Sequence, residues 1–273
     1  MKIYSRIQLF SIVVGILFIS INTSCKTQKN NSSTGDKDKE LSVLTYNIHH
    51  ANPPSKPDVI DIDAICKVIK QSDADIIALQ EVDVRTNRSG KIDQAKLIAE
   101  KLGMNYHFFK AIDHDGGDYG IAILSKFPIR NPQNIALPQV EKAESRTLAI
   151  LEVQVKNKWI NMVNTHLDAS KSDKNRVAQM KFILDKASKW KLPVILCGDL
   201  NSVPTSETIR LLDTYFQRTC TDNCLPTCPQ GKPRTTIDHI ATKNFPWKQK
   251  SIEVIAETYA SDHRPVKVVF GLN

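Results

Sequence analysis

Apolar positions along the chain follow two periods, one typical of strands and the other typical of helices. Apolar residues three and four apart predict helices over residues 60–71, 93–102, 176–190 and 206–212. Short apolar or alternating runs predict strands over residues 41–47, 75–79, 120–124, 146–155, 159–164, 193–197, 237–241 and 266–270. Residues 41–273 are long enough for one large domain with a substantial core.

Three local signals refine this pattern. Gly103 is well placed to end the second helix. The runs 146–155 and 159–164 predict a β-hairpin with Asn157-Lys158 as its turn. Residues 218–236 form a long loop rich in proline and cysteine, and loops of this length are usually functional or disordered.

Polar clusters interrupt or follow many of the predicted strands. They are Thr45-Tyr46-Asn47, Gln80-Glu81, Asn164-Thr165-His166, Gly198-Asp199-Leu200-Asn201 and Ser261-Asp262-His263. Adjacent residues of a strand point to opposite faces, so Asp262 and His263 can serve one pocket only from a strand end or a loop. Most clusters lie at strand C-termini or just after them, where pockets form when sheets pack against helices.

The residue types in these clusters suggest metal-assisted hydrolysis of a phosphate ester. A hard divalent cation held by carboxylates can neutralise the charge of the transition state, and Glu81 is the best candidate ligand. His166 and His263 can donate to phosphate oxygens and work as acid or base near neutral pH.

Further carboxylates and carboxamides complete this set. Asp199 and Asp238 are placed to orient a histidine or to deprotonate water. Asn47 and Asn201 can position groups without adding charge.

Seven motifs in chain order carry a resemblance to a known family. They are Thr45-Tyr46-Asn47, Leu79-Gln80-Glu81-Val82, Tyr119-Gly120-Ile121-Ala122-Ile123-Leu124-Ser125, Asn164-Thr165-His166-Leu167, Gly198-Asp199-Leu200-Asn201, Ile237-Asp238-His239-Ile240 and Ser261-Asp262-His263. Together they resemble the motif set of the endonuclease/exonuclease/phosphatase (DNase I-like) superfamily, across residues 41–270. The resemblance implies a four-layered α/β sandwich, in which two mixed β-sheets pack face to face with helices outside.

The resemblance also implies a cofactor and a set of roles. It implies a Mg²⁺ or Mn²⁺ site with Glu81 as the ligand and Asn47 and Asp262 as its near neighbours. The remaining roles that it implies are activation of water by Asp199 beside Asn201, contacts to the scissile phosphate from His166 and His263, and orientation of His263 by Asp238.

Departures from the family pattern narrow the substrate. His49 stands where abasic-site endonucleases of this fold carry an aspartate. The Trp-Cys-Asp-Arg signature of 5-phosphatases is absent, and no long aromatic hairpin of the sphingomyelinase kind is present. The candidate substrate contacts are His49, Arg85, Tyr119 and Arg146. Alternatives stay open for three of them: Arg85 as a solvated loop charge, Tyr119 as core, and Arg146 as a structural ion pair. His50, His107 and His114 lack motif support, so no role is predicted for them.

The N-terminus has the features of a targeting segment. Lys2 and Arg6 precede a 15-residue, mostly apolar stretch, and Cys25 follows. Residues 1–24 are therefore predicted to be a lipoprotein signal peptide, with Cys25 lipidated and residues 25–40 forming a flexible tether. We expect a bacterial cell-envelope protein that is anchored to a membrane and faces the periplasm or the cell surface. A plain secretory signal and an uncleaved anchor are the alternatives.

Composition and cysteine use add two constraints. The formal net charge of +8 suits anionic substrates but equally suits solubility. Cys66 and Cys197 are expected to be buried, and two of Cys220, Cys224 and Cys228 are expected to form a disulfide. A zinc site made by the last three thiols is the alternative, although no fourth ligand stands nearby in a fitting motif.

The function predicted from these observations is metal-dependent phosphoester hydrolysis by an exported monomer. A phosphodiesterase acting on lipid head groups or small phosphodiesters is favoured over a secreted nuclease. Nucleic acid remains a possible partner, but the lysines are scattered apart from the group Lys171, Lys174 and Arg176. A non-catalytic binding module on the same fold is a further alternative, which the complete set of site residues disfavours.

Overall fold

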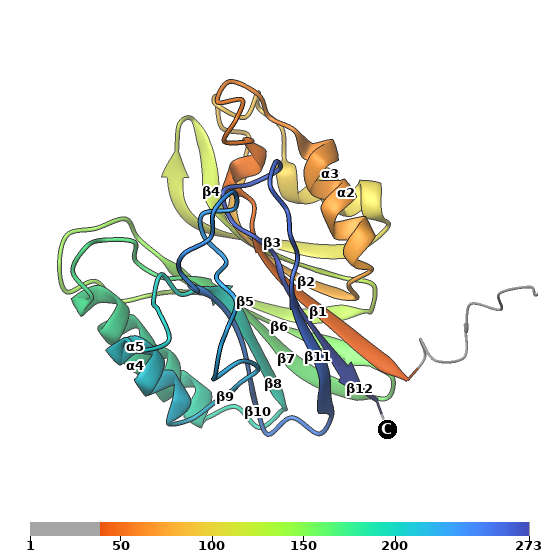
Figure 1. The fold of residues 1–273 in the computed structure, drawn as a ribbon, viewed down its shortest axis with the longest axis vertical. Coiled ribbons are helices and arrows are strands. Elements are labelled where there is room, and N and C mark those ends of the chain that lie inside the picture. Colours follow the sequence, from red (N-terminus) through yellow and green to blue (C-terminus); the bar gives the residue numbers. More distant parts are fainter. Residues whose placement is uncertain (1–38, 273) are drawn as a thin grey trace, which may run out of the picture. The chain divides into compact units, whose positions relative to one another are not determined.

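The computed structural model describes residues 39–272 (Figure 1). The predicted signal peptide, Cys25 and residues 26–38 of the tether lie outside the described residues. Within the described part, no helix is long and apolar enough to cross a membrane. The described chain forms two six-stranded sheets and the helices that cover them.

The first sheet has the order β11-β12-β1-β2-β4-β3. Its strands are β1 Glu40–Asn47, β2 Ile76–Val84, β3 Asn105–His114, β4 Gly117–Ser125, β11 Lys248–Val254 and β12 Val266–Gly271. β1 and β2 run parallel, with Asn47 opposite Gln80, and the other neighbours are antiparallel. The parallel pair places the ends of β1 and β2 at the same edge of the sheet.

The second sheet has the order β5-β6-β7-β8-β10-β9. Its strands are β5 Ile129–Ala136, β6 Thr147–Val155, β7 Lys158–His166, β8 Val194–Asp199, β9 Gln217–Arg218 and β10 Asp238–Lys243. β7 and β8 are its parallel pair, with His166 opposite Asp199. Each sheet is therefore mixed, and each has parallel strands that end close to the candidate residues.

Four α-helices and a short 3₁₀ turn accompany the sheets. They are η1 His49–Ala51, α2 Ile62–Ser72, α3 Gln94–Leu102, α4 Lys174–Ser188 and α5 Glu207–Asp213. Asp61, Asp93 and Ser206 cap three of these helices by accepting a backbone N–H three residues later. Gly103 ends α3 in the left-handed conformation, as predicted.

Three apolar layers hold these elements together. Between the sheets, side chains such as Val43 and Ile123 pack with Leu151 and Ile195. A second cluster joins α2 and α3 to the outer face of the first sheet, and a third joins α4 and α5 to the outer face of the second. The order of layers is helix, sheet, sheet and helix, so the predicted four-layered sandwich is confirmed.

Three long strands were not predicted from the sequence. β3, β5 and β11 are edge strands; β5 and β11 are almost wholly exposed, whereas β3 is half-buried. An exposed edge strand has no buried face, so its sequence does not alternate in the usual way. The hairpin between β6 and β7 is confirmed, but its turn is Lys156-Asn157, because Lys158 already pairs with Val155.

Gly198 in β8 shows how tightly the strands approach the site. A Cβ atom at Gly198 would lie 2.1 Å from the carbonyl oxygen of Thr165 in β7. Because that obstacle is backbone, it cannot move without distorting the strand that carries His166. The sequence cluster around Gly198 therefore depends on glycine for close approach of two strands.

We predict that Gly198→Ala lowers the free energy of unfolding by about 1–3 kcal/mol, which is the usual cost of overpacking. The matched control is Gly231→Ala, since a Cβ there meets nothing within 4 Å. Chemical denaturation of both variants measures the difference. Equal stability of the two variants would show that β7 and β8 can separate freely.

Candidate active site

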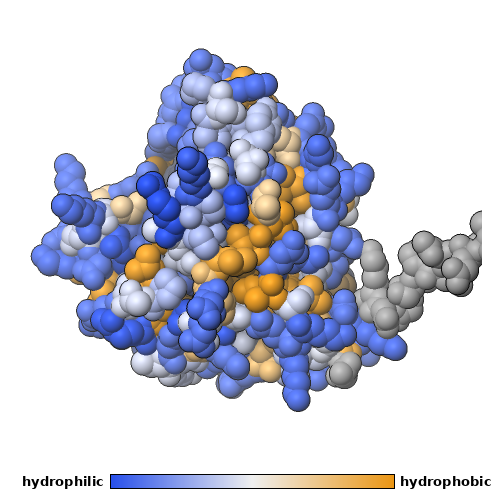
Figure 2. Space-filling view, viewed as in Figure 1, coloured by the Kyte–Doolittle hydropathy of each residue, from blue (hydrophilic) through white to orange (hydrophobic). Residues whose placement is uncertain are grey.

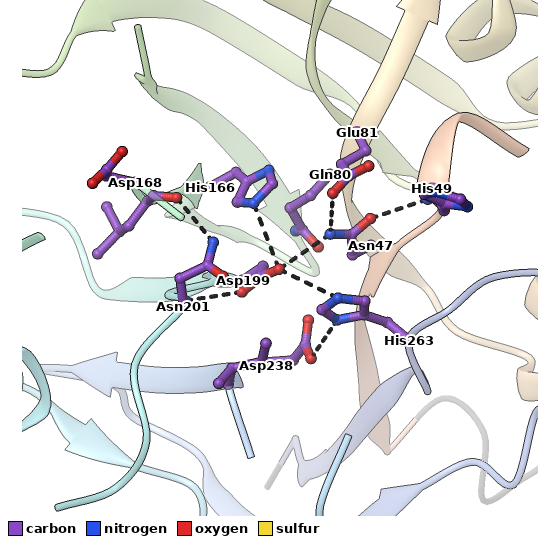
Figure 3. Close-up of polar contacts among 12 residues, drawn as sticks. Asn47, His49, Gln80, Glu81, His166, Asp168, Asp199, Asn201, Asp238 and His263 are labelled. Carbon is purple, nitrogen blue, oxygen red and sulfur yellow. Dashed lines mark hydrogen bonds and ion pairs between the residues drawn. The ribbon is translucent and has the colours of Figure 1, made fainter. Parts of the chain in front are cut away.

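The polar clusters of the sequence meet where the ends of β1, β7 and β8 converge (Figure 3). Asn47, His166 and Asp199 are the last residues of β1, β7 and β8. Asp238 is the first residue of β10 and lies opposite Asp199 in the antiparallel register. His263 reaches the same place from the loop before β12. Both sheets thus contribute to one site.

Asp199 lies at the centre of this site. Its Oδ2 accepts a hydrogen bond from Asn47 Nδ2 at 3.1 Å and lies 3.6 Å from His166 Nε2 and 3.7 Å from His263 Nε2. Its Oδ1 accepts the backbone N–H of Asn201 at 2.9 Å. The side chain is almost completely buried. A carboxylate with these neighbours has a fixed orientation.

Burial sets the proton affinity of Asp199. Burial, and then repulsion from the charge of Asp238, raise the pKa of Asp199 to about 7, against the lowering effect of His263 and the donated hydrogen bonds. A carboxyl group with this pKa can take or release a proton at neutral pH.

His263 belongs to a buried chain of hydrogen bonds. Its Nδ1 lies 2.9 Å from Asp238 Oδ2, and the hydroxyl of Thr227 donates to the same oxygen at 2.5 Å. Burial acts to lower the pKa of His263, but the charges of Asp238 and Asp199 outweigh it and hold that pKa well above its usual value. The imidazole is therefore protonated at neutral pH, with Nε2–H directed toward Asp199.

His166 differs from His263 in its charge state. Burial, followed by the positive charges of Arg146 and His263, holds the pKa of His166 well below its usual value. Arg146 Nη1 lies 3.2 Å from His166 Nδ1, so the guanidinium donates to Nδ1 and leaves the proton on Nε2. His166 is thus a neutral imidazole whose Nε2–H faces Asp199. Arg146 is itself paired with Glu144 at 2.8 Å.

Glu81 projects into the site from an irregular point of β2. Its backbone is left-handed, with φ of 57°, and the pairing of β2 with β4 shifts register between Leu79 and Val82. Such a bulge redirects a side chain out of the regular alternation. Oε1 of Glu81 accepts a hydrogen bond from Asn47 Nδ2 at 2.9 Å.

Asp262 approaches Glu81 from the loop before β12. Ser261 holds this loop to the end of β1, because its hydroxyl donates to the carbonyl of Asn47 at 2.7 Å and accepts the N–H of His263. Burial raises the pKa of Glu81, and the negative charge of Asp262 raises it further. The two carboxylates are therefore close enough to repel one another.

This donor set fits a hard divalent cation. Glu81 offers a carboxylate oxygen next to the carboxamide of Asn47, and the negative charge of Asp262 is near enough to act on Glu81. Oxygen ligands of this kind suit Mg²⁺ and Mn²⁺. A cation between the two carboxylates would also relieve their repulsion.

Comparison with known proteins agrees with this geometry. Residues 44–263 match the model of the endonuclease/exonuclease/phosphatase family. The chain belongs to the endonuclease/exonuclease/phosphatase family. It is therefore a phosphoric ester hydrolase. No curated protein matches the chain significantly.

Solved structures share the fold of this family member. An endonuclease/exonuclease/phosphatase family protein from Bacteroides thetaiotaomicron superposes with a TM-score of 0.70 at 19% identity, over 86% of this chain and 98% of that one. A mannosyl-6-phosphatase from the same organism gives 0.68 at 19% identity, over 84% and 98%. The catalytic domain of human Nocturnin gives 0.68 at 22% identity, over 85% and 93%.

The candidate substrate contacts divide into two groups. Tyr119 is buried and lines one small cavity together with Arg146 and His166. Arg85 has an exposed side chain that forms no hydrogen bond or ion pair with any residue of the described range. Arg88 lies nearer than Arg85, with its guanidinium 5.4 Å from the centre of the Tyr119 ring, but it is paired with Asp83 at 2.7 Å.

The histidines after β1 also reach the site. His49 donates its N–H to Asn47 Oδ1 at 3.0 Å, and His50 Nδ1 lies 4.0 Å from Glu81 Oε2. The sequence predicted no role for His50, yet the structure puts it beside the candidate metal ligand. Its position directly after His49 was the available signal.

The cysteine loop contributes directly to the site. Cys220 and Cys224 form a disulfide, which confirms one bridge among the three thiols and excludes a zinc site made by all of them. Cys228 is free, and a backbone hydrogen bond from Arg264 to Thr227 holds its loop beside His263, while Cys66 and Cys197 are buried, as expected. The sequence carried no signal for Thr227, because the hydroxyl lies in an irregular loop eleven residues before its partner Asp238.

We predict that Thr227→Val lowers kcat about tenfold, because a hydrogen bond to a buried charged group contributes roughly 1.5–3 kcal/mol. The matched control is Thr221→Val in the same loop, where the hydroxyl contacts only exposed Asp222. The loss should disappear in a His263→Ala background, since Thr227 acts through Asp238 and His263. An equal loss in both backgrounds would mean that Thr227 supports the fold alone.

Proposed function

We propose that this hydrolase is an exported, metal-dependent phosphodiesterase that cleaves lipid head groups or other small phosphodiesters with water. The observation that carries the proposal is the placement of Asp199 between two imidazoles of unlike charge and the carboxamide of Asn47. A buried base beside two N–H donors suits attack on a phosphate, which is an anion that a base alone would repel.

The two imidazoles bind the phosphate in different charge states. His263 carries a positive charge that Asp238 maintains, and His166 donates from a neutral ring. Both Nε2–H groups face the same region, so they can donate to oxygens of one phosphoryl group. Arg146 fixes which nitrogen of His166 is protonated and so fixes its role as a donor.

Asp199 acts as the general base. It takes a proton from water as the water oxygen bonds to phosphorus and the bond to the leaving oxygen breaks. Asn47 and the N–H of Asn201 hold the two carboxylate oxygens, so the base does not need to reorient during the reaction.

Glu81 and Asp262, with Asn47 beside them, would hold Mg²⁺ or Mn²⁺. When bound, such a cation would neutralise the negative charge on the phosphoryl and leaving oxygens. The chain supplies the remainder: Asn47 donates to Glu81, and the hydroxyl of Ser261 holds the Asp262 loop to the end of β1.

A pocket of mixed polar and apolar lining behind Asp238 is the place that we assign to an apolar part of the substrate. The pocket has a volume of about 170 Å³; Leu225, Ile252 and Val254 form its apolar part, and polar residues such as Asp222, Thr227 and Asp238 form the remainder. Leu225 and Ile252 are also among the exposed large apolar residues. Figure 2 shows hydrophobic surface gathered across the middle of this face, over the C-terminal segments drawn in blue in Figure 1.

The charges near His166 give little support to a nuclease. Lys174 is paired with Glu141 at 2.6 Å, and Arg176 donates to the carbonyls of Asp168 and Ser170. A nuclease needs a row of free cations along its groove to follow the phosphate backbone. The one group of basic residues that the sequence offered is largely occupied in contacts within the protein.

The predicted anchor fits this choice of substrate. Lipidation of Cys25 and a tether over residues 25–40 would keep the enzyme at a membrane, where lipid phosphodiesters are concentrated. This part of the proposal rests on the sequence pattern alone.

We predict that Glu81→Ala abolishes turnover of bis-p-nitrophenyl phosphate while circular dichroism stays unchanged. The variant loses the carboxylate that Asn47 positions. Glu253→Ala, on exposed strand β11, is the control and should turn over normally. Survival of wild-type activity in EDTA would refute metal dependence.

We predict that Cys25→Ser moves the protein from the membrane fraction to the soluble fraction or stalls its processing, because serine has no thiol to acylate. Cys228→Ser should fractionate as the wild type does. Immunoblots of both fractions provide the measurement, and a Cys25→Ser protein that stays with the membrane would contradict lipid anchoring.

A further inference from the structure

His49, His50 and Glu81 form a cluster of donors that the proposed mechanism does not use as a unit. Each offers one ligand atom, and these atoms lie within 4.8 Å of one another. Ligands around a zinc-sized ion, each at about 2.0–2.2 Å, lie roughly 3–4 Å apart. Small side-chain adjustments would bring all three to one ion.

His49 is oriented as a metal-binding histidine is. Its Nδ1 lies 2.8 Å from the carbonyl oxygen of Asn52, so this nitrogen carries the proton and Nε2 carries the lone pair. Metal-bound histidines usually donate their second nitrogen to such a carbonyl, which fixes the ring. Asn52 is anchored in turn, because its side chain donates to the carbonyls of Lys56, Pro57 and Val59.

His50 offers a buried nitrogen that has no hydrogen-bond partner in residues 39–272. This atom, Nδ1, lies 4.0 Å from Glu81 Oε2, which is too long for a hydrogen bond. Oε1 of Glu81 is already bound to Asn47, so Oε2 is the oxygen that faces the histidines. A cation between these two atoms would satisfy both.

The backbone brings the two rings to one side. His49, His50 and Ala51 all have left-handed φ values, of 46°, 42° and 58°. Neighbouring side chains of a regular strand diverge, whereas here the ring centres are 4.5 Å apart. Non-glycine residues are uncommon in this conformation, and three in succession fix the backbone that carries the two rings.

We propose that His49 Nε2, His50 Nδ1 and Glu81 Oε2 bind a second divalent ion of the transition-metal type, such as Zn²⁺. Two imidazoles and one carboxylate favour zinc, iron or cobalt over magnesium, which takes oxygen ligands. The inference goes beyond the proposed function, because it rests on the histidine pair and on no step of hydrolysis. Glu81 joins this site to the oxygen-ligand site beside Asp262.

The test is calorimetric titration of the purified full chain with Zn²⁺ in saturating Mg²⁺. We expect one Zn²⁺ per chain in the wild type. His49→Asn and His50→Asn remove an imidazole while keeping a residue that tolerates left-handed φ. Each should weaken binding by more than about 100-fold, since loss of even an outer-shell partner typically costs 10–100-fold. His107→Asn, an exposed position of β3, is the matched control.

Four results would overturn the proposal. Zinc affinity unchanged in His49→Asn and His50→Asn would place the ion elsewhere, and its loss in His263→Ala alone would assign it to the Asp199, Asp238 and His263 group. Complete exclusion of zinc by Mg²⁺ would leave one shared site. X-ray absorption at the zinc edge checks the wild type without any variant: two imidazole nitrogens are expected, and a sulfur ligand would contradict the assignment. These measurements report zinc binding, so a failure of this proposal is distinguishable from a failure of the proposed hydrolysis.

Discussion

The site depends on keeping one carboxylate, Asp199, buried at the junction of two sheets. A buried charge is costly unless hydrogen bonds and opposite charges surround it. Here a carboxamide comes from one sheet, an imidazole from the other, and a second imidazole from the loop before β12. If the packing of either sheet were lost, the carboxylate of Asp199 would lose a hydrogen-bond partner or become exposed to solvent. The same burial that threatens stability raises the proton affinity into the range that catalysis at neutral pH requires.

Buried amides hold the sheets in the register that this arrangement needs. Gln80 Nε2 donates to Asn164 Oδ1 at 2.8 Å, and the Asn164 amide donates to the carbonyls of Leu79 and Ala122. These bonds cross between the two sheets directly beneath the polar site. Apolar packing alone tolerates sliding, whereas buried amides leave unpaired groups if they shift. The polar clusters in the sequence therefore serve both the chemistry and the alignment of the sheets.

Much of this architecture could be predicted from the sequence because buried strands and their terminal polar residues leave a clear pattern. The convergence of Asn47, His166 and Asp199 follows from strand ends that lie at one edge. Other features depend on backbone irregularity, which hydrophobic periodicity does not report. The left-handed conformation of His50 brings it beside its neighbour's ring, and Thr227 reaches its partner across an irregular loop. Edge strands such as β5 were missed because they bury no face.

The central claim is that Asp199 accepts the proton of the attacking water. Its most direct test is the pH dependence of kcat/KM for a phosphodiester, measured on wild type and on Asp199→Asn at saturating Mg²⁺. Because the pKa of Asp199 is about 7, the wild-type rate should rise with pH until about pH 7. A bound cation that favours the ionised carboxylate would move the end of this rise to a lower pH. The near-isosteric variant should lose this rise and roughly 10²–10⁴-fold of the rate. A variant that keeps the wild-type rate and profile would contradict the account.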